Sequence, residues 1–132
     1  MAIAAALVEM AGAHPERAAQ ARAEALAGAD RDAAAYTGLI EARRAPENAP
    51  AVAAALEEAA AAPLATARLG AEVAALATAS RGQSRPSVGP DLEVAEGLAR
   101  AACRAAAGLV LVNLADDPGH PMAVEAASLA AS

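Results

Sequence analysis

Residues 92–114 read LEVAEGLARAACRAAAGLVLVNL, and this stretch decides the fold class. Alanine and leucine dominate it, and both residues favour helix strongly on intrinsic scales. We therefore predict a helix from about Pro90 to about Leu114. The rest of the chain has the same character, because alanine supplies more than a third of its residues and Tyr36 is its one aromatic residue. A β-sandwich or barrel would need many more aromatic and β-branched residues, so the sequence predicts an all-α protein.

Pro and Gly clusters mark where the other helices begin and end. The sequence predicts turns at 45–50 and 116–119 and a loop at 80–90. Helices are expected over 2–12, from 15 to about 44, from the first of these turns up to the loop, and over about 121–130. Asn48 is a plausible N-cap. Gly28 and Asp30 are candidates for a kink, and Pro63 should bend or break its helix because proline lacks the backbone N–H. The predicted fold is a single domain, 1–132, built as an antiparallel helical bundle of four to six helices.

Composition also limits the partners of this chain. An alanine-rich core buries little area per residue, so we expect the bundle to be completed by a second copy as a homodimer. The net charge is −6 and the basic residues form no dense stripe, which argues against nucleic acid. No apolar run approaches the roughly 18 residues of a membrane span. The lone Cys103 is interpreted as a small buried hydrophobe in a reducing, cytoplasmic setting.

Motifs that would carry catalysis or bind metal are scarce. The sequence contains no CxxC, HExxH, Walker or GxGxxG pattern. Asp116, Asp117 and His120 are better explained as a helix-ending turn than as metal ligands, and no metal is predicted. Two carboxylates stand out: Asp32, which shares a helix face with Tyr36 one turn later, and Asp91, at a helix start after an arginine-bearing loop. On the residues alone, Asp32 is a solvated helix residue and Asp91 a capping residue.

Four short elements follow one another in a recognisable order: DAAAY at 32–36, APL at 62–64, Asp91 at a helix start, and LVLVNL at 109–114. Together they resemble the cyclodeaminase/cyclohydrolase family. Members of that family carry Asp-x-x-Ala-Phe/Tyr, a Val-Pro-Leu helix break, an Asp at a helix start, and Asn-Val-x-Ile-Asn-Leu. Asp91 falls on the family Asp and Asn113 on the last Asn of the final element. The resemblance covers roughly residues 20–115.

The sequence also departs from the family pattern. Met1 already falls inside the helix that normally follows a Pro-Gly-Gly-Gly segment, so that segment is expected to be missing. The residues at 83–87, QSRPS, replace the family's Gly-Asn-Pro-Asn loop, and Leu109 replaces the first Asn of the last element.

The resemblance implies an all-α homodimer with a folate cleft near the subunit interface. Members convert 5-formiminotetrahydrofolate to 5,10-methenyltetrahydrofolate with loss of ammonia, or hydrolyse the methenyl compound. It implies a tetrahydrofolate derivative as substrate and no tightly bound cofactor. Asp32 and Asp91 are then the candidate catalytic residues, since such reactions need proton transfer near neutral pH. Candidate substrate-binding residues are Tyr36, Arg81, Arg85 and Asn113, with the arginines facing the glutamate tail.

Two alternatives stay open at this stage. A truncated or non-catalytic relative would keep the fold and lack a folate site. A helical interaction module would show a sustained heptad pattern or a wide amphipathic face.

Overall fold

The computed structural model describes residues 1–12, 14–44 and 48–131. Within these residues the chain forms five α-helices, one short 3-10 helix and no strand. The elements are α1 (Ala2–Ala11), α2 (Pro15–Ala42), α3 (Ala49–Ser80), η1 (Pro86–Val88), α4 (Gly89–Asn113) and α5 (Pro121–Ala130). The predicted all-α bundle is therefore confirmed. Of the predicted turn at 45–50, residues 45–47 lie outside the described residues.

Local signals account for several helix boundaries. Pro15 occupies the first turn of α2, where its missing N–H costs nothing. Asn48 caps α3 as predicted, since its side-chain oxygen accepts from the Ala51 N–H at 3.3 Å. Asp91 lies in the first turn of α4, where a negative charge is favourable. α2 runs unbroken through Gly28 and Asp30.

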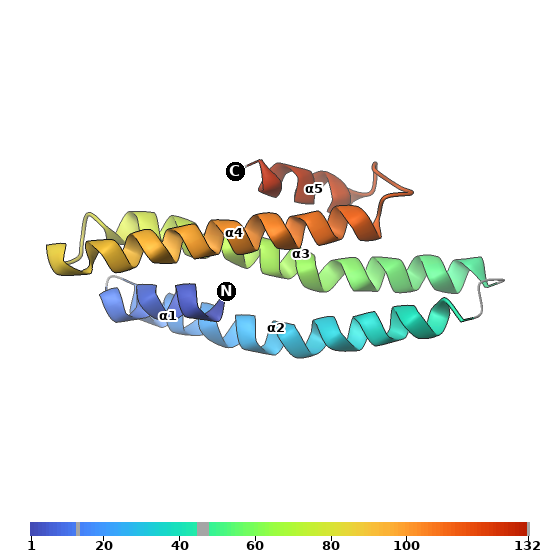
Figure 1. Cartoon of the computed structure of the whole chain (residues 1–132), viewed down its shortest axis with the longest axis horizontal. Helices are drawn as coiled ribbons and strands as arrows, with labels where there is room; N and C mark the ends of the chain where they lie inside the picture. Colours follow the sequence, from blue (N-terminus) through green and yellow to red (C-terminus); the bar gives the residue numbers. More distant parts are fainter. Residues whose placement is uncertain (13, 45–47, 132) are drawn as a thin grey trace.

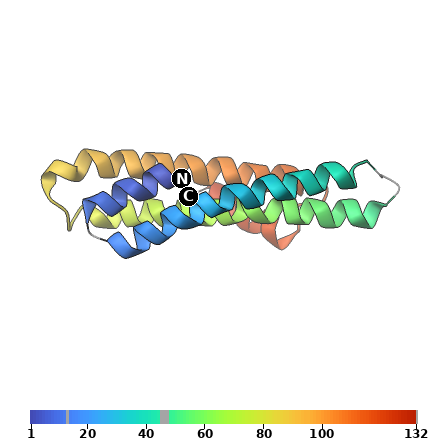
Figure 2. The ribbon, with the colours of Figure 1, turned by 90° about the horizontal axis from the view of Figure 1, so that it is seen from below.

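The helices form an elongated bundle. Figure 1 shows α3 between α4 and α2, with α5 packed across α4 on the side away from α2. α1 lies beside the first half of α2, and Figure 2 shows it covering only part of the bundle length. The end of α3 and the start of α4 lie at one end of the bundle, and the end of α2 and the start of α3 lie at the other. None of the helices in the described part of the chain has both the length and the apolar character required to cross a membrane.

The core divides along the bundle into two clusters. One joins α1, the start of α2, the end of α3 and the start of α4. The other joins the middle of α3, the end of α4 and α5. Most core positions are alanine, so the helix axes approach closely and few large side chains are buried; Val8, Leu39, Leu64, Leu69, Val73, Leu92, Val110 and Leu114 are the larger ones. Cys103 is buried, as predicted.

Ion pairs between helices set how the helices are placed relative to one another. Arg22 on α2 pairs with Glu9 on α1 at 3.0 Å. Arg68 on α3 pairs with Glu125 on α5 through two hydrogen bonds of 2.6 Å. Exposed pairs of this kind add little stability, but their geometry favours one register over its neighbours.

Pro63 lies buried inside α3 and the helix continues through it unbroken, although a bend or a break was predicted there. Proline cannot donate to the carbonyl four residues earlier, which is that of Ala59. Asn113, at the end of α4, donates its side-chain N–H to this carbonyl at 3.0 Å. The side chain of a neighbouring helix therefore supplies the hydrogen bond that Pro63 removes, and the helix continues.

Candidate functional site

The six residues predicted to form the site lie on different parts of the bundle. Asp32 and Tyr36 are exposed on the second half of α2, and Tyr36 is 63% exposed. Asp91 is exposed in the first turn of α4, and Asn113 ends the same helix. Arg81 follows α3 and Arg85 precedes η1, at the end of the bundle near Asp91.

A single chain does not bring these residues into one crevice. Asp91 and Asn113 are separated by almost the whole of α4, which corresponds to about 33 Å at 1.5 Å per residue. Arg31, Ala34 and Ala35, around Asp32, line a groove with Ala61, Ala62 and Ala65 of α3. This part of α3 lies between the level where Ala59 meets Asn113 and the level where Gly70 meets Cys103 of α4. At 1.5 Å per residue, Asp32 therefore lies about 27 Å along the bundle from Asp91.

Arg81 is engaged within the chain. Its guanidinium pairs with Glu96 of α4, which also accepts from Arg100 at 3.0 Å. The hydrogen bond from Arg100, together with the positive charges of Arg81 and Arg100, lowers the pKa of Glu96. The Glu96 side chain is only 17% exposed. Arg81 would have to exchange this partner to meet a ligand, whereas Arg85 is exposed.

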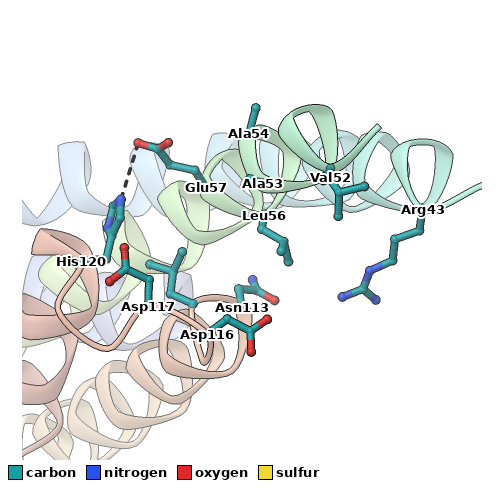
Figure 3. A pocket seen from close by; sticks show the side chains of 12 residues that line it. Arg43, Val52, Ala53, Ala54, Leu56, Glu57, Asn113, Asp116, Asp117 and His120 are labelled. Carbon is teal, nitrogen blue, oxygen red and sulfur yellow. Dashed lines mark ion pairs between the residues drawn. The ribbon is translucent and has the colours of Figure 1, made fainter. Parts of the chain in front are cut away.

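A cleft of about 620 Å³ opens between the start of α3 and the connection from α4 to α5. Figure 3 shows its labelled side chains, with Arg43 at one side and His120 at the other. Its apolar wall includes Val52, Leu56 and Leu114, and its polar residues are Arg43, Glu57, Asn113, Asp116, Asp117 and His120. This volume is typical of small-molecule sites, which combine an apolar lining with a few polar groups.

Asn113 is the one predicted site residue that lines this cleft. Its amide nitrogen is committed to the Ala59 carbonyl. The amide oxygen remains as an acceptor, and Figure 3 shows it directed away from α3, towards Asp116 and Arg43.

His120 lies at the opposite side of the cleft. It precedes α5, and its Nδ1 accepts from the Met122 backbone N–H at 3.2 Å. Its Nε2 lies 3.7 Å from an oxygen of Glu57 on α3. The His120 side chain is 21% exposed. His120, in the connection from α4 to α5, therefore caps the first turn of α5 through Nδ1 and faces Glu57 of α3 through Nε2.

Sequence reasoning missed most of this cleft. Asp116, Asp117 and His120 were interpreted only as a helix-ending turn, and Arg43 and Glu57 carried no signal at all. These residues meet because of how the end of α2, the start of α3 and the connection after α4 are aligned along the bundle, which no local pattern encodes. Among the described residues, no group of three or more His, Cys, Asp or Glu side chains is arranged to hold a metal ion.

The fold and the cleft define a class: small all-α domains with a ligand-sized cleft at one end of the bundle. The family model for formiminotransferase-cyclodeaminase matches residues 1–119. The match covers most of the 132 residues, and the chain therefore belongs to this family. Among curated proteins no match to the sequence is found.

Proposed function

We propose that this protein is a folate one-carbon enzyme of the cyclodeaminase/cyclohydrolase type, acting in the cytoplasm. The observation that carries the proposal is the family match over residues 1–119, together with a cleft large enough for a heterocyclic ligand. The reaction is either cyclisation of 5-formiminotetrahydrofolate with loss of ammonia or hydrolysis of 5,10-methenyltetrahydrofolate.

Both reactions pass through a tetrahedral carbon and depend on proton transfer. Asp32 and Asp91 are the proposed proton-transfer residues, and Tyr36 flanks Asp32 one turn along α2. Arg85 is exposed at a loop and suits the carboxylates of the glutamate tail, because guanidinium groups bind carboxylates bidentately. Asn113 is proposed to hold the ligand through its free amide oxygen.

These residues lie far apart along a single chain. We propose a homodimer in which residues from two copies complete each site. The outward face of α4 supports this, because Val94, Leu98, Leu109 and Val112 are 54%, 43%, 54% and 72% exposed. At 100° per residue these four side chains form one stripe along the helix, well away from the buried face that includes Leu92, Ala99 and Val110.

The solvent-accessible surface of the chain is larger than that of a compact monomer of the same mass, as such an assembly would explain. The chain exposes 7275 Å². A compact monomer of its mass exposes about 6,300 Å², so the excess is about 1,000 Å². Each partner of a standard interface contributes about 800 Å². A second copy on α4 would cover a comparable area.

Titration with 5,10-methenyltetrahydrofolate tests the function directly, with turnover of both candidate substrates followed by absorbance. We expect binding and turnover by the wild type. Asp32→Asn and Asp91→Asn should each lower kcat at least about tenfold if they transfer protons. Asp30→Asn, two residues before Asp32, and Glu93→Gln, two residues after Asp91, are matched controls and should leave kcat unchanged. No binding by the wild type, or full activity in both Asp variants, would remove the proposal.

A further inference from the structure

We infer that His120 forms a pH-sensitive switch between α5 and α3: the neutral ring caps α5, whereas the protonated ring gives up the cap and pairs with Glu57. The inference does not depend on the proposed reaction, because it concerns only how the chain responds to protons. It also concerns a part of the chain beyond the family match, which covers residues 1–119. His120 and α5 follow that range.

The neutral His120 ring carries its hydrogen on Nε2. Its Nδ1 accepts from the Met122 backbone N–H at 3.2 Å, so Nδ1 holds a lone pair there and not a hydrogen. The backbone carbonyl of His120 accepts from the N–H groups of Ala123 and Val124 at 2.9 and 3.0 Å. The ring thus serves an N–H at the helix start that lacks an intrahelical acceptor.

Protonation of the ring and capping of α5 exclude each other. A second hydrogen has to enter at Nδ1, because Nε2 already carries one. A protonated Nδ1 is a donor and cannot accept from the Met122 N–H. The positive charge would also lie at the N-terminus of α5, where the helix dipole disfavours a cation. The charged ring is therefore expected to turn away from Met122.

Glu57 on α3 supplies the partner for the charged ring. Its carboxylate lies 3.7 Å from Nε2, and Figure 3 shows the ring directed at it. This distance exceeds the usual hydrogen-bond range, and a shift of about 0.5 Å would bring the two atoms within it. The Glu57 side chain is 62% exposed and has room to make that shift. Opposite charges this close attract each other appreciably at a protein surface.

The other charged groups around the ring come from two elements. Asp116 and Asp117 precede it in the same connection, and Arg43, at the end of α2, lies at the opposite side of the cleft. With Glu57 on α3, the cleft therefore presents three carboxylates and one guanidinium to the ring. The net negative charge favours a cation in the cleft wall over a cation at the start of α5.

The remainder of α5 stays docked when the ring changes partner. Ala123 and Ala126 are buried in the core. Glu125 accepts from Arg68 of α3 through two hydrogen bonds of 2.6 Å. The hydrogen bond from Arg68 lowers the pKa of Glu125, so this pair stays charged at and above pH 5. The switch therefore changes only the first turn of α5 and the position of the ring in the cleft wall.

Imidazole and backbone ¹H–¹⁵N spectra of the full chain, recorded between pH 8 and pH 5 without any ligand, test the switch. Histidine rings ordinarily change charge in this range. At pH 8 the ring ¹⁵N shifts of His120 should show the hydrogen on Nε2. As the pH falls, the His120 ring and the Met122 amide should titrate together. Protection of the Met122 amide against exchange, corrected for the intrinsic effect of pH, should fall about fivefold, the loss expected when an N-cap is removed.

Variants separate the cap from the ion pair. His120→Asn and His120→Asp both keep an N-cap that does not titrate in this range, so the Met122 amide should stop responding to pH. Glu57→Gln removes the partner of the charged ring and should move the midpoint to lower pH. His14→Asn is the matched control, because His14 is the N-cap residue of α2 but its side chain makes no cap hydrogen bond. It should leave the Met122 response unchanged.

Several outcomes overturn the inference. They are a neutral ring with its hydrogen on Nδ1, a His120 that does not titrate between pH 8 and pH 5, and a Met122 amide that keeps its protection while His120 titrates. A wild-type response to pH in the Asn and Asp variants overturns it as well. An unchanged midpoint in Glu57→Gln overturns the assignment of Glu57 as the partner. None of these results depends on folate binding, so the proposed function is tested separately.

Discussion

Asn113 on α4 supplies the hydrogen bond that Pro63 removes from α3. Its side-chain nitrogen lies 3.0 Å from the Ala59 carbonyl, the acceptor that a residue with an N–H at position 63 would use. Pro63 and Asn113, which are 50 residues apart in the sequence, are thereby linked through the carbonyl oxygen of Ala59. The pairing also explains why a buried proline is compatible with an unbroken α3.

This relationship predicts a measurable coupling between the two positions. Asn113→Ala should destabilise the protein by about 1–3 kcal/mol, because it leaves a largely buried carbonyl unpaired. In a Pro63→Ala background the same change should cost less, since the substituted alanine donates its own N–H. Urea unfolding of the four proteins gives the coupling energy, expected at about 1 kcal/mol or more. Pro50→Ala is the control, because Pro50 lies in the first turn of α3. Coupling of equal size with Pro50 would contradict the explanation.

Gly70 lies at a close approach of α3 to α4. A Cβ on Gly70 would lie 2.9 Å from the Cys103 Cβ and from the Ala99 carbonyl oxygen. Gly70→Ala should therefore destabilise the protein by about 1–3 kcal/mol, because a packed core resists an added methyl group. Gly97→Ala on α4 is the control: nothing lies within 4 Å of its Cβ position, so it should stabilise the helix by about 0.4–1 kcal/mol. Thermal unfolding measures both, and equal effects would refute the close contact.

Much of the fold follows from local chemistry in the sequence. The alanine-rich helices, the Asn48 cap and Pro15 in a first turn all depend on neighbours within a few residues. The continuity of α3 through Pro63 could not be predicted in this way. The compensating donor comes from Asn113, on a different helix.

The candidate site was less predictable for the same reason. Only Asn113 of the predicted set lines the cleft. Arg81 forms an ion pair with Glu96, and the two side chains meet only because α3 packs against α4. The spacing of Asp32 and Asp91 along the sequence says nothing about their separation along the bundle axis. Their proposed joint role depends on contacts between chains, which a single sequence does not specify.

The Glu96 carboxylate should make stability depend on pH in the acidic range. Its pKa is lowered, first by the hydrogen bond from Arg100 and then by the two arginine charges. A carboxylate with a lowered pKa stabilises the folded state above its unfolded value of about 4.3, and this contribution is lost as the pH falls through its folded pKa. Glu96→Gln should thus cost up to roughly 1 kcal/mol at pH 7, discounted because both arginines are partly exposed.

The measurement is urea unfolding of wild type and Glu96→Gln at pH 7 and at about pH 3, well below the ordinary carboxyl pKa. The difference between the two proteins should shrink at the lower pH, because the wild-type carboxyl takes up a proton as the pH falls towards and through its lowered pKa. Glu58→Gln on α3 serves as the control, because its side chain is exposed and no ion pair is found for it in the described residues. A difference for Glu96→Gln that persists undiminished at low pH would show that its charge is not the cause.

The exposed apolar stripe on α4 predicts the oligomeric state. Because Leu109 and Val112 would be buried by a second copy, Leu109→Glu should place a charge in the interface and convert the protein to a monomer that keeps its helix content. Val124→Glu on α5 is the matched control, since Val124 is 58% exposed and Leu109 is 54% exposed. Size-exclusion chromatography with light scattering should give a dimer for the wild type and for Val124→Glu. A monomeric wild type would leave Asp32 and Asp91 about 27 Å apart along the bundle, with no second chain to complete the site.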